Sequence, residues 1–156
     1  MNGLLYQMLS SSGFTVKMVS ACVYDGEVPG PEFDHMALIV NFSGAEYVAD
    51  VGFGDSFREP LKFETGLIQN QGNKYYRIES IGESSYILKQ SDDGIMFSNM
   101  YKFSTAAREL SDFEQMCNYH QTSPLSHFTQ KRIITIAKSN GRVTISGRKL
   151  IETLEG

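Results

Sequence analysis

The chain has 156 residues, of which 41% are hydrophobic and 21% are charged, and its formal net charge is −4. This composition is typical of a folded domain with its own core and excludes a long disordered chain. The acidic balance argues against a nucleic-acid or membrane-surface partner, because both require an excess of Lys and Arg. No apolar run approaches the length that spans a bilayer, and the first residues lack the pattern of a secretory signal. We therefore expect a cytoplasmic protein with no membrane partner.

The cysteines and histidines indicate neither a disulfide framework nor a metal site. Cys22 and Cys117 are far apart and form no C-x-x-C motif, which favours a reducing compartment. The three histidines have spacings that match no zinc pattern. We expect no bound metal.

The first thirteen residues predict a helix. Their apolar residues recur at helical spacing, and Gly13 stands where a glycine commonly follows the last helical turn. No Ser, Thr, Asp or Asn precedes the helix as an N-cap, which indicates that the chain starts late. From Phe14 the pattern changes to strands, first over the β-branched residues 15–24, and then to a turn over 25–34, which holds two prolines and two glycines.

The rest of the chain predicts mostly strands. After His35 comes an apolar run over 36–42, a Ser43-Gly44 turn and a returning strand over 46–51. Further strands are expected at 74–81, 84–90, 95–103, 132–138 and 142–145, with a short helix at 110–120. Asn140-Gly141, between the last two of these strands, is a strong hairpin signal. The expected fold class is α+β, an N-terminal helix followed by an antiparallel, barrel-like sheet with one further helix.

His35 and Asp50 form the most informative pair. His35 opens one strand and Asp50 lies near the end of the next, so the two side chains can meet across adjacent antiparallel strands. An Asp that accepts from one imidazole nitrogen fixes the tautomer and leaves the other nitrogen free to act as a base. The alternative is an ordinary pair that bridges two strands. Likewise, residues 52–54, Gly-Phe-Gly, could be a tight turn that requires positive φ.

Several segments, in this order and spacing, resemble the arylamine N-acetyltransferase family over the whole chain. They are Asn2-Gly3-Leu4-Leu5 with Gly13-Phe14, Ser20-Ala21-Cys22-Val23, His35-Met36 to Val40, Val48-Ala49-Asp50-Val51-Gly52-Phe53-Gly54, Glu59-Pro60-Leu61, Asp112-Phe113-Glu114 to Asn118-Tyr119, and Gln121-Thr122-Ser123-Pro124-Leu125-Ser126-His127-Phe128. Each segment is moderately specific by itself. Five or more in register make a specific resemblance.

The resemblance implies acetyl transfer from acetyl-CoA to arylamines or hydrazines through a Cys-His-Asp triad. In that reaction His35 would make the thiolate, and Asp50 would orient His35. It also implies a cysteine-protease-like fold, of which residues 1–14 would be part of the nucleophile helix. Residues 15–103 would be the β-barrel domain with the His and Asp, and residues 104–156 part of a C-terminal α/β region.

The chain departs from the family at the nucleophile. The family motif is Arg-Gly-Gly-x-Cys-aromatic-Glu-Leu-Asn-Gly, and Asn2-Gly3 matches its end, so the Cys would fall three residues before Met1. We therefore expect a truncated chain that is inactive alone, also short of the family's C-terminal helix, with a complementary N-terminal fragment as a candidate partner. Cys22 and Cys117 are expected to pack as small hydrophobes rather than to replace the nucleophile.

Coenzyme A contacts are implied by the resemblance at two places: Gly52, Phe53 and Gly54, and Ser126, His127 and Phe128. Backbone amides near glycine suit phosphate and oxyanion contacts. For Phe128 the alternative is core packing. Two other functions stay open, a non-catalytic remnant that binds coenzyme A and an amide synthase or hydrolase on the same fold.

Overall fold

The structure is a computed structural model that describes residues 1–54, 56–130, 132–138 and 141–154. It divides into two compact units, Met1–Phe113 and Glu114–Gly156. The first unit holds the helix, the large sheet and the pair of interest. The division of the chain into functional segments at residues 14 and 103 stays a prediction.

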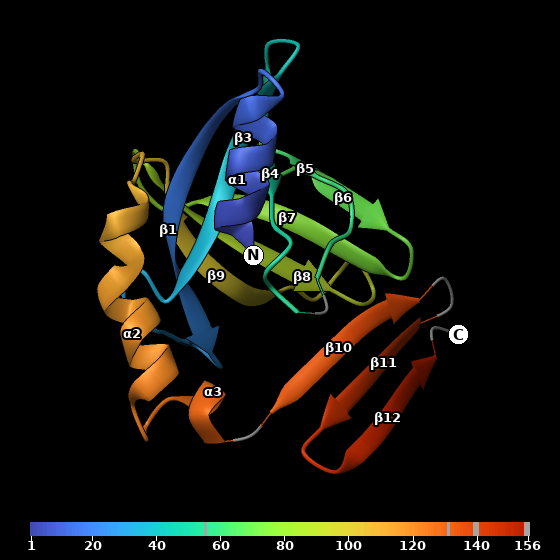
Figure 1. The fold of residues 1–156 in the computed structure, drawn as a ribbon. Helices are drawn as coiled ribbons and strands as arrows, with labels where there is room; N and C mark the ends of the chain where they lie inside the picture. The colour runs from blue at the N-terminus through green and yellow to red at the C-terminus, as the bar shows by residue number, and fades with distance from the viewer. Residues whose placement is uncertain (55, 131, 139–140, 155–156) are drawn as a thin grey trace. The chain divides into compact units, whose positions relative to one another are not determined.

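The first unit is a helix followed by an antiparallel sheet that curves into a nearly closed barrel (Figure 1). Along the main path of the sheet the strands follow the order β5-β4-β3-β1-β9-β8-β7-β6, and β2 pairs with β1 at one end. The elements are α1 (Asn2–Ser11), β1 (Thr15–Asp25), β2 (Val28–Pro29), β3 (His35–Phe42), β4 (Ala45–Ala49), β5 (Leu61–Lys62), β6 (Ile68–Gln71), β7 (Lys74–Ser80), β8 (Ser85–Ser91), β9 (Ser98–Ser104) and the 3₁₀ turn η1 (Leu110–Phe113). This arrangement confirms the expected fold class.

Helix α1 ends as the sequence predicts. Gly13 adopts φ 88°, a left-handed conformation that costs glycine little. The N–H of Gly13 donates to Ser10 O, and the N–H of Phe14 donates to Leu9 O, at 3.0 and 3.1 Å. These two bonds form a Schellman motif, and Leu9 and Phe14 join the same apolar cluster. The chain thereby turns directly from α1 into β1.

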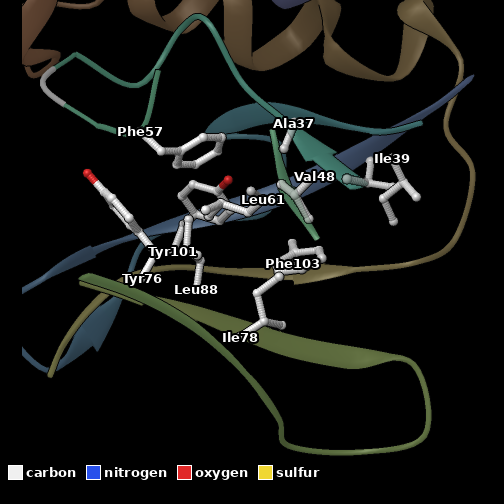
Figure 2. Close-up of a cluster of buried hydrophobic side chains, with 12 residues drawn as sticks. Ala37, Ile39, Val48, Phe57, Leu61, Tyr76, Ile78, Leu88, Tyr101 and Phe103 are labelled. Atoms are coloured by element: carbon white, nitrogen blue, oxygen red, sulfur yellow. The ribbon is translucent and has the colours of Figure 1, made fainter. Parts of the chain in front are cut away.

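Strand β3 is buried on both faces, which explains its unbroken apolar run. Its even-numbered residues, such as Leu38 and Val40, belong to the cluster that includes Leu5 and Leu9 of α1. On the other face, Ala37 and Ile39 point into the barrel interior and join the second cluster, much of which Figure 2 labels. The largest fully buried side chains of that cluster are Tyr76, Tyr101, Phe103, Ile39, Leu61, Ile78 and Leu88.

The two ends of the sheet, β5 and β6, are joined by glutamine side chains. The Gln69 amide accepts from Lys62 N–H at 2.7 Å and donates to Lys62 O at 3.0 Å. The Gln71 amide accepts from the Arg58 and Glu59 N–H groups and donates to Glu59 O. An amide side chain offers the same donor and acceptor as a peptide group, so each glutamine replaces part of a strand's ladder. These bonds, with the bridge between Thr65 and Ile78, nearly close the barrel.

The second unit contains α2 (Glu114–Thr122), α3 (His127–Gln130), and an antiparallel sheet of β10 (Ile133–Lys138), β11 (Gly141–Ser146) and β12 (Lys149–Leu154). The predicted β10–β11 hairpin is confirmed by its register, whereas Asn140 of its turn lies outside the described residues. One helix was expected over 110–120. The structure has a 3₁₀ turn and then α2, because Asp112 accepts from the Glu109 N–H and holds the first turn tight.

Strand β12, with six residues, lies outside the ranges in which the sequence predicted strands. Short elements account for most of the other differences. Strands β2, β5 and β6 and helix α3 have two to four residues each, too few to show a period. Strand β9 begins at Ser98 rather than Ile95. The Asp93 carboxylate accepts from the N–H groups of Ile95 and Met96, which keeps both residues in the preceding turn.

Candidate active site

The β3–β4 hairpin brings His35 and Asp50 together. Its turn has Ser43 at φ 52° and Gly44 at φ 82°, the two left-handed positions of a type I′ turn, which matches the twist of a hairpin. The resulting register pairs Leu38 with Ala49. Asp50 therefore follows opposite Ala37, two residues from His35 and on the same face, within diagonal reach of a long side chain.

The His35 Nε2 atom lies 2.7 Å from Asp50 Oδ2. The Asp50 side chain has no exposed surface, and 14% of the His35 side chain is exposed. Burial raises the pKa of Asp50, but the hydrogen bond and charge of His35, the Asn2 amide and the Gly52 N–H outweigh it and hold the pKa below its usual value. The carboxyl group is therefore ionised at neutral pH.

An ionised Asp50 determines the tautomer of His35. A carboxylate can only accept, so Nε2 carries the proton of the neutral imidazole and donates it to Asp50. The other ring nitrogen, Nδ1, then has the lone pair. Such an imidazole can take a proton from a thiol, hydroxyl or amine, and the nearby carboxylate stabilises the resulting imidazolium.

Aromatic rings and a glycine pack around the imidazole. The His35 ring centroid lies 5.2 Å from that of Phe53 and 5.5 Å from that of Tyr101. Burial, with the charge of Asp50, raises the pKa of Tyr101 well above its usual value, so the phenol stays neutral. A Cβ atom at Gly52 would lie 3.3 Å from His35 Cε1, so glycine is what allows the chain to pass this closely.

The loop before β3 is held in an unusual conformation. Phe33 has φ 66°, rare for a bulky residue, and its N–H donates to Ser20 Oγ at 2.9 Å. Its ring packs edge-on against Phe113, and the Arg108 guanidinium lies over it. These contacts fix the point at which the chain enters β3, two residues before His35.

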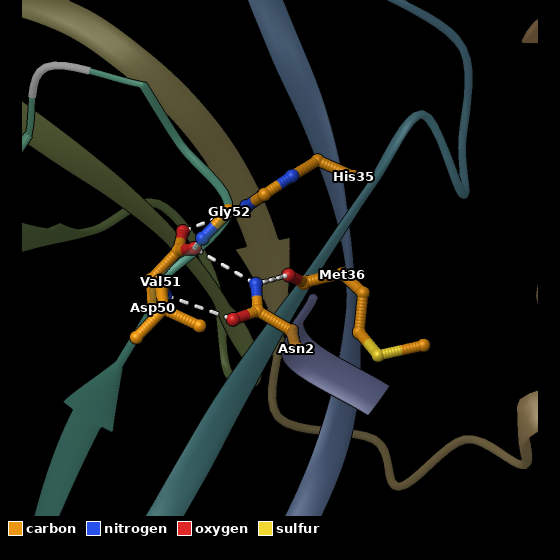
Figure 3. A network of polar contacts seen from close by, with 6 residues as sticks. All are labelled: Asn2, His35, Met36, Asp50, Val51 and Gly52. Carbon is orange, nitrogen blue, oxygen red and sulfur yellow. Dashed lines mark hydrogen bonds and ion pairs between the residues drawn. The ribbon is translucent and has the colours of Figure 1, made fainter. Parts of the chain in front are cut away.

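Asn2 is a site residue that the sequence analysis missed. It lies in the first turn of α1, is 4% exposed, and donates from Nδ2 to Asp50 Oδ1 at 2.8 Å (Figure 3). Its Oδ1 accepts from the Val51 N–H at 2.9 Å. A signal is present in the sequence, since Asn2 stands in the segment that resembles the end of the nucleophile motif.

The family model for N-acetyltransferases matches residues 1–156. The chain belongs to the arylamine N-acetyltransferase family. Arylamine N-acetyltransferase 1 of Homo sapiens is 30% identical over 161 residues, which cover 90% of this chain and 55% of that protein. The Mycolicibacterium smegmatis arylamine N-acetyltransferase is 30% identical over 155 residues, which cover 96% of this chain and 56% of that protein.

Solved structures of this family share the fold. The M. smegmatis arylamine N-acetyltransferase matches with a TM-score of 0.86 at 29% identity, over 98% of this chain and 57% of that one. The Mycobacterium marinum arylamine N-acetyltransferase in complex with CoA matches with a TM-score of 0.82 at 26% identity, over 99% of this chain and 62% of that one. The chain thus spans little more than half the length of the relatives it matches.

Neither cysteine of this family member has the features of an activated nucleophile. Cys22 follows Ala21, which pairs with His35 across β1 and β3, so the Cys22 side chain points to the opposite face of the sheet. Burial raises the pKa of Cys22, the Lys102 charge opposes this, and Glu32 and Asp34 add to it. Cys117 belongs to the second unit. It is exposed and accepts from the Gln121 amide, so its expected packing as a small hydrophobe is wrong.

The residues expected to contact coenzyme A lie in both units. Gly52, Phe53 and Gly54 directly follow Asp50, and the Gly52 N–H already donates to Asp50 Oδ1 at 2.8 Å. In the second unit Ser126 is buried, and its Oγ atom lies 3.3 Å from His120 Nδ1. His127 is exposed, and Phe128 is 74% exposed, so the alternative of core packing for Phe128 is wrong. Coenzyme A contacts at these residues stay a prediction.

Within the described part of the chain, no group of three or more His, Cys, Asp or Glu side chains is placed to hold a metal ion. No helix in those ranges is long and apolar enough to cross a membrane.

Proposed function

We propose that this chain provides the base and the orienting carboxylate of an arylamine N-acetyltransferase, with acetyl-CoA as acetyl donor and an arylamine or hydrazine as acceptor. The observation that carries the proposal is the buried His35–Asp50 pair, whose geometry leaves His35 Nδ1 as the basic atom. Membership of the family supports the reaction class, and the CoA complex of the M. marinum relative supports the donor.

The nucleophile of this reaction is a cysteine thiol from outside residues 1–156. His35 Nδ1 removes the thiol proton, and the thiolate attacks the acetyl carbonyl of acetyl-CoA. The tetrahedral intermediate expels the CoA thiolate, which takes the proton back from His35, and an acetyl thioester is left on the cysteine. The amine then attacks this thioester, His35 accepts the amine proton, and the cysteine thiolate is released.

Asp50 contributes by stabilising the imidazolium that forms in both half-reactions. Its side chain is fully buried, so the attraction between carboxylate and imidazolium is weakly screened by solvent. Neither Cys22 nor Cys117 is suited to act as that nucleophile. Residues 1–156 by themselves are therefore inactive, and a complementary segment that carries the cysteine would restore turnover. The two free cysteines favour a reducing compartment, so we place the reaction in the cytoplasm.

A fusion tests the proposal. The N-terminal portion of a family member that has the complete nucleophile motif, through Arg-Gly-Gly-x-Cys-aromatic-Glu-Leu, is joined to Asn2, and acetyl transfer from acetyl-CoA to 4-aminobenzoate or a hydrazine is measured. We expect turnover by the fusion, none by residues 1–156 alone, and an acetyl adduct on the added cysteine by mass spectrometry. The controls are a Cys-to-Ser change in the added segment, His35→Gln and Asp50→Asn.

Two outcomes would contradict the proposed catalytic role, and a third would contradict the proposed acceptor. One is full turnover in the His35→Gln fusion, because the base would then lie elsewhere. The other is a folded fusion that binds coenzyme A but forms no acetyl adduct, which would favour the non-catalytic binding function. An adduct that passes to an amine other than an arylamine or hydrazine would favour an amide synthase on the same fold.

A further inference from the structure

The side-chain amide of Asn2 makes three hydrogen bonds, to β3 and to the segment that directly follows β4, which together carry the pair. Nδ2 donates to Asp50 Oδ1 and to Met36 O, and Oδ1 accepts from the Val51 N–H (Figure 3). Met36 follows His35 in β3, and Val51 follows Asp50 after β4. Within the described residues 1–54, Asn2 is the one side chain of α1 that hydrogen-bonds to this pair of segments.

These bonds allow one orientation of the amide. If it were flipped, Oδ1 would face the Met36 carbonyl and the Asp50 carboxylate, and the NH₂ group would face the Val51 N–H. The Oδ1 acceptor would then face two other acceptors, and the NH₂ donor would face the N–H donor of Val51. In the observed orientation both amide hydrogens are donated. Asn2 is nearly fully buried, so water cannot replace these bonds, and no other residue type of this size satisfies all three partners.

The same bonds determine which oxygen of Asp50 reaches His35. Asp50 Oδ1 accepts from Asn2 Nδ2 and from the Gly52 N–H, both at 2.8 Å. This leaves Oδ2 to accept from His35 Nε2. These two donors therefore fix the plane of the Asp50 carboxylate independently of the His35 imidazole.

We propose that Asn2 is a positioning residue of the His35–Asp50 pair, whose amide fixes the Asp50 carboxylate and ties the start of α1 to both strands. As a catalytic role, this inference rests on the proposed function. A nucleophile that precedes Asn2 in the chain would be held relative to His35 by these same three bonds. Asn2 acts through Asp50 and the backbone, without touching a reacting atom.

Two variants separate positioning from a merely structural role. Asn2→Asp keeps the size of the side chain and an oxygen that accepts from the Val51 N–H, but it replaces the donor with a second carboxylate oxygen that faces Asp50 and Met36 O. Asn2→Ala removes all three bonds. If Asn2 only fills space and satisfies the Val51 N–H, Asn2→Asp behaves like the unaltered chain. If its amide positions the pair, Asn2→Asp is at least as disruptive as Asn2→Ala.

The measurement is NMR on the 156-residue chain, with Gln7→Ala as a control on an exposed position of α1. The ¹⁵N shifts of the His35 ring report the share of the Nε2–H tautomer, and the ¹³C shift of the Asp50 carboxyl reports its titration. We expect both Asn2 variants to reduce the Nε2–H share and to raise the pKa of Asp50, and Gln7→Ala to change neither. Unchanged ring shifts and an unchanged Asp50 titration in a folded Asn2→Asp chain would overturn the proposal.

A fallback variant and a second measurement complete the test. If Asn2→Ala does not fold, the size-conserving Asn2→Asp variant carries the comparison alone. In the fusion, we expect either variant to lower the rate of acetylation by about 10- to 100-fold, the usual cost of a misplaced catalytic group. A fusion without turnover whose His35 and Asp50 signals still depend on Asn2 would reject the proposed function and leave Asn2 as the residue that positions the pair.

Discussion

Gly52 and Gly54 lie in one turn, and substitution by alanine should affect them for different reasons. A Cβ atom at Gly52 would lie 3.1 Å from Asn2 Nδ2 and 3.3 Å from His35 Cε1, both tighter than ordinary contact. Both neighbours are hydrogen-bonded to Asp50, so neither can move by a few tenths of an ångström without lengthening a bond. At Gly54 a Cβ atom would meet nothing within 4 Å, but the backbone has φ 55°.

The stability costs should be similar. Overpacking of this kind costs about 1–3 kcal/mol. A left-handed non-glycine residue costs about 1–2 kcal/mol. The smaller conformational freedom of alanine in the unfolded chain offsets about 0.4–1 kcal/mol in each case. We therefore expect a loss of about 1–2 kcal/mol in the free energy of unfolding for Gly52→Ala and about 1 kcal/mol or less for Gly54→Ala.

Function should separate the two variants. Urea unfolding measures the stability, and acetyl transfer by the fusion measures the site. We expect Gly52→Ala to lower kcat at saturating acetyl-CoA by about 10- to 100-fold, because it displaces the imidazole. Gly54→Ala places no atom against the His35–Asp50 pair, so it should act on the KM for acetyl-CoA and leave kcat close to that of the unaltered fusion. Equal kcat values in the two variants at similar stability would refute the reasoning, because the His35 ring would then have room to yield without consequence.

Three further outcomes are expected. The pKa of Asp50 is lower in the folded protein than in the unfolded chain, where it is about 3.9. The ionised carboxylate therefore stabilises the fold above that pH, and this stabilisation is lost as the pH falls through the folded pKa. In Asp50→Asn, the urea concentration at the midpoint of unfolding should depend less on pH in this range. Gln69→Glu should cost about 1 kcal/mol in urea unfolding, because Lys62 O loses its donor. Leu4 and Met8 are 77% and 58% exposed, so the chain should self-associate in sedimentation, and Leu4→Glu with Met8→Lys should reduce this without changing the circular dichroism.

Local rules determined much of the fold. Gly13 ended α1 through its left-handed conformation, and Ser43-Gly44 formed the tight turn that fixes the β3–β4 register. Because side chains alternate along a strand, that register placed His35 and Asp50 on one face, and their contact could be expected from the sequence. These features depend on residues close together in the chain, so the sequence pattern carries them.

Contacts between distant segments required the tertiary structure. Asn2 meets Asp50 across 48 positions, and no periodicity or turn signal links the two residues. Gln69 joins β6 to β5, and Gln71 joins β6 to the segment just before β5; these bonds likewise depend on the curvature of the sheet, because they form only where its two ends meet. The sequence by itself therefore determined most of the longer elements, the family and the His35–Asp50 pair. Only the tertiary structure decided which buried amide orients that pair, because a side-chain hydrogen bond depends on position in space and not on spacing along the chain.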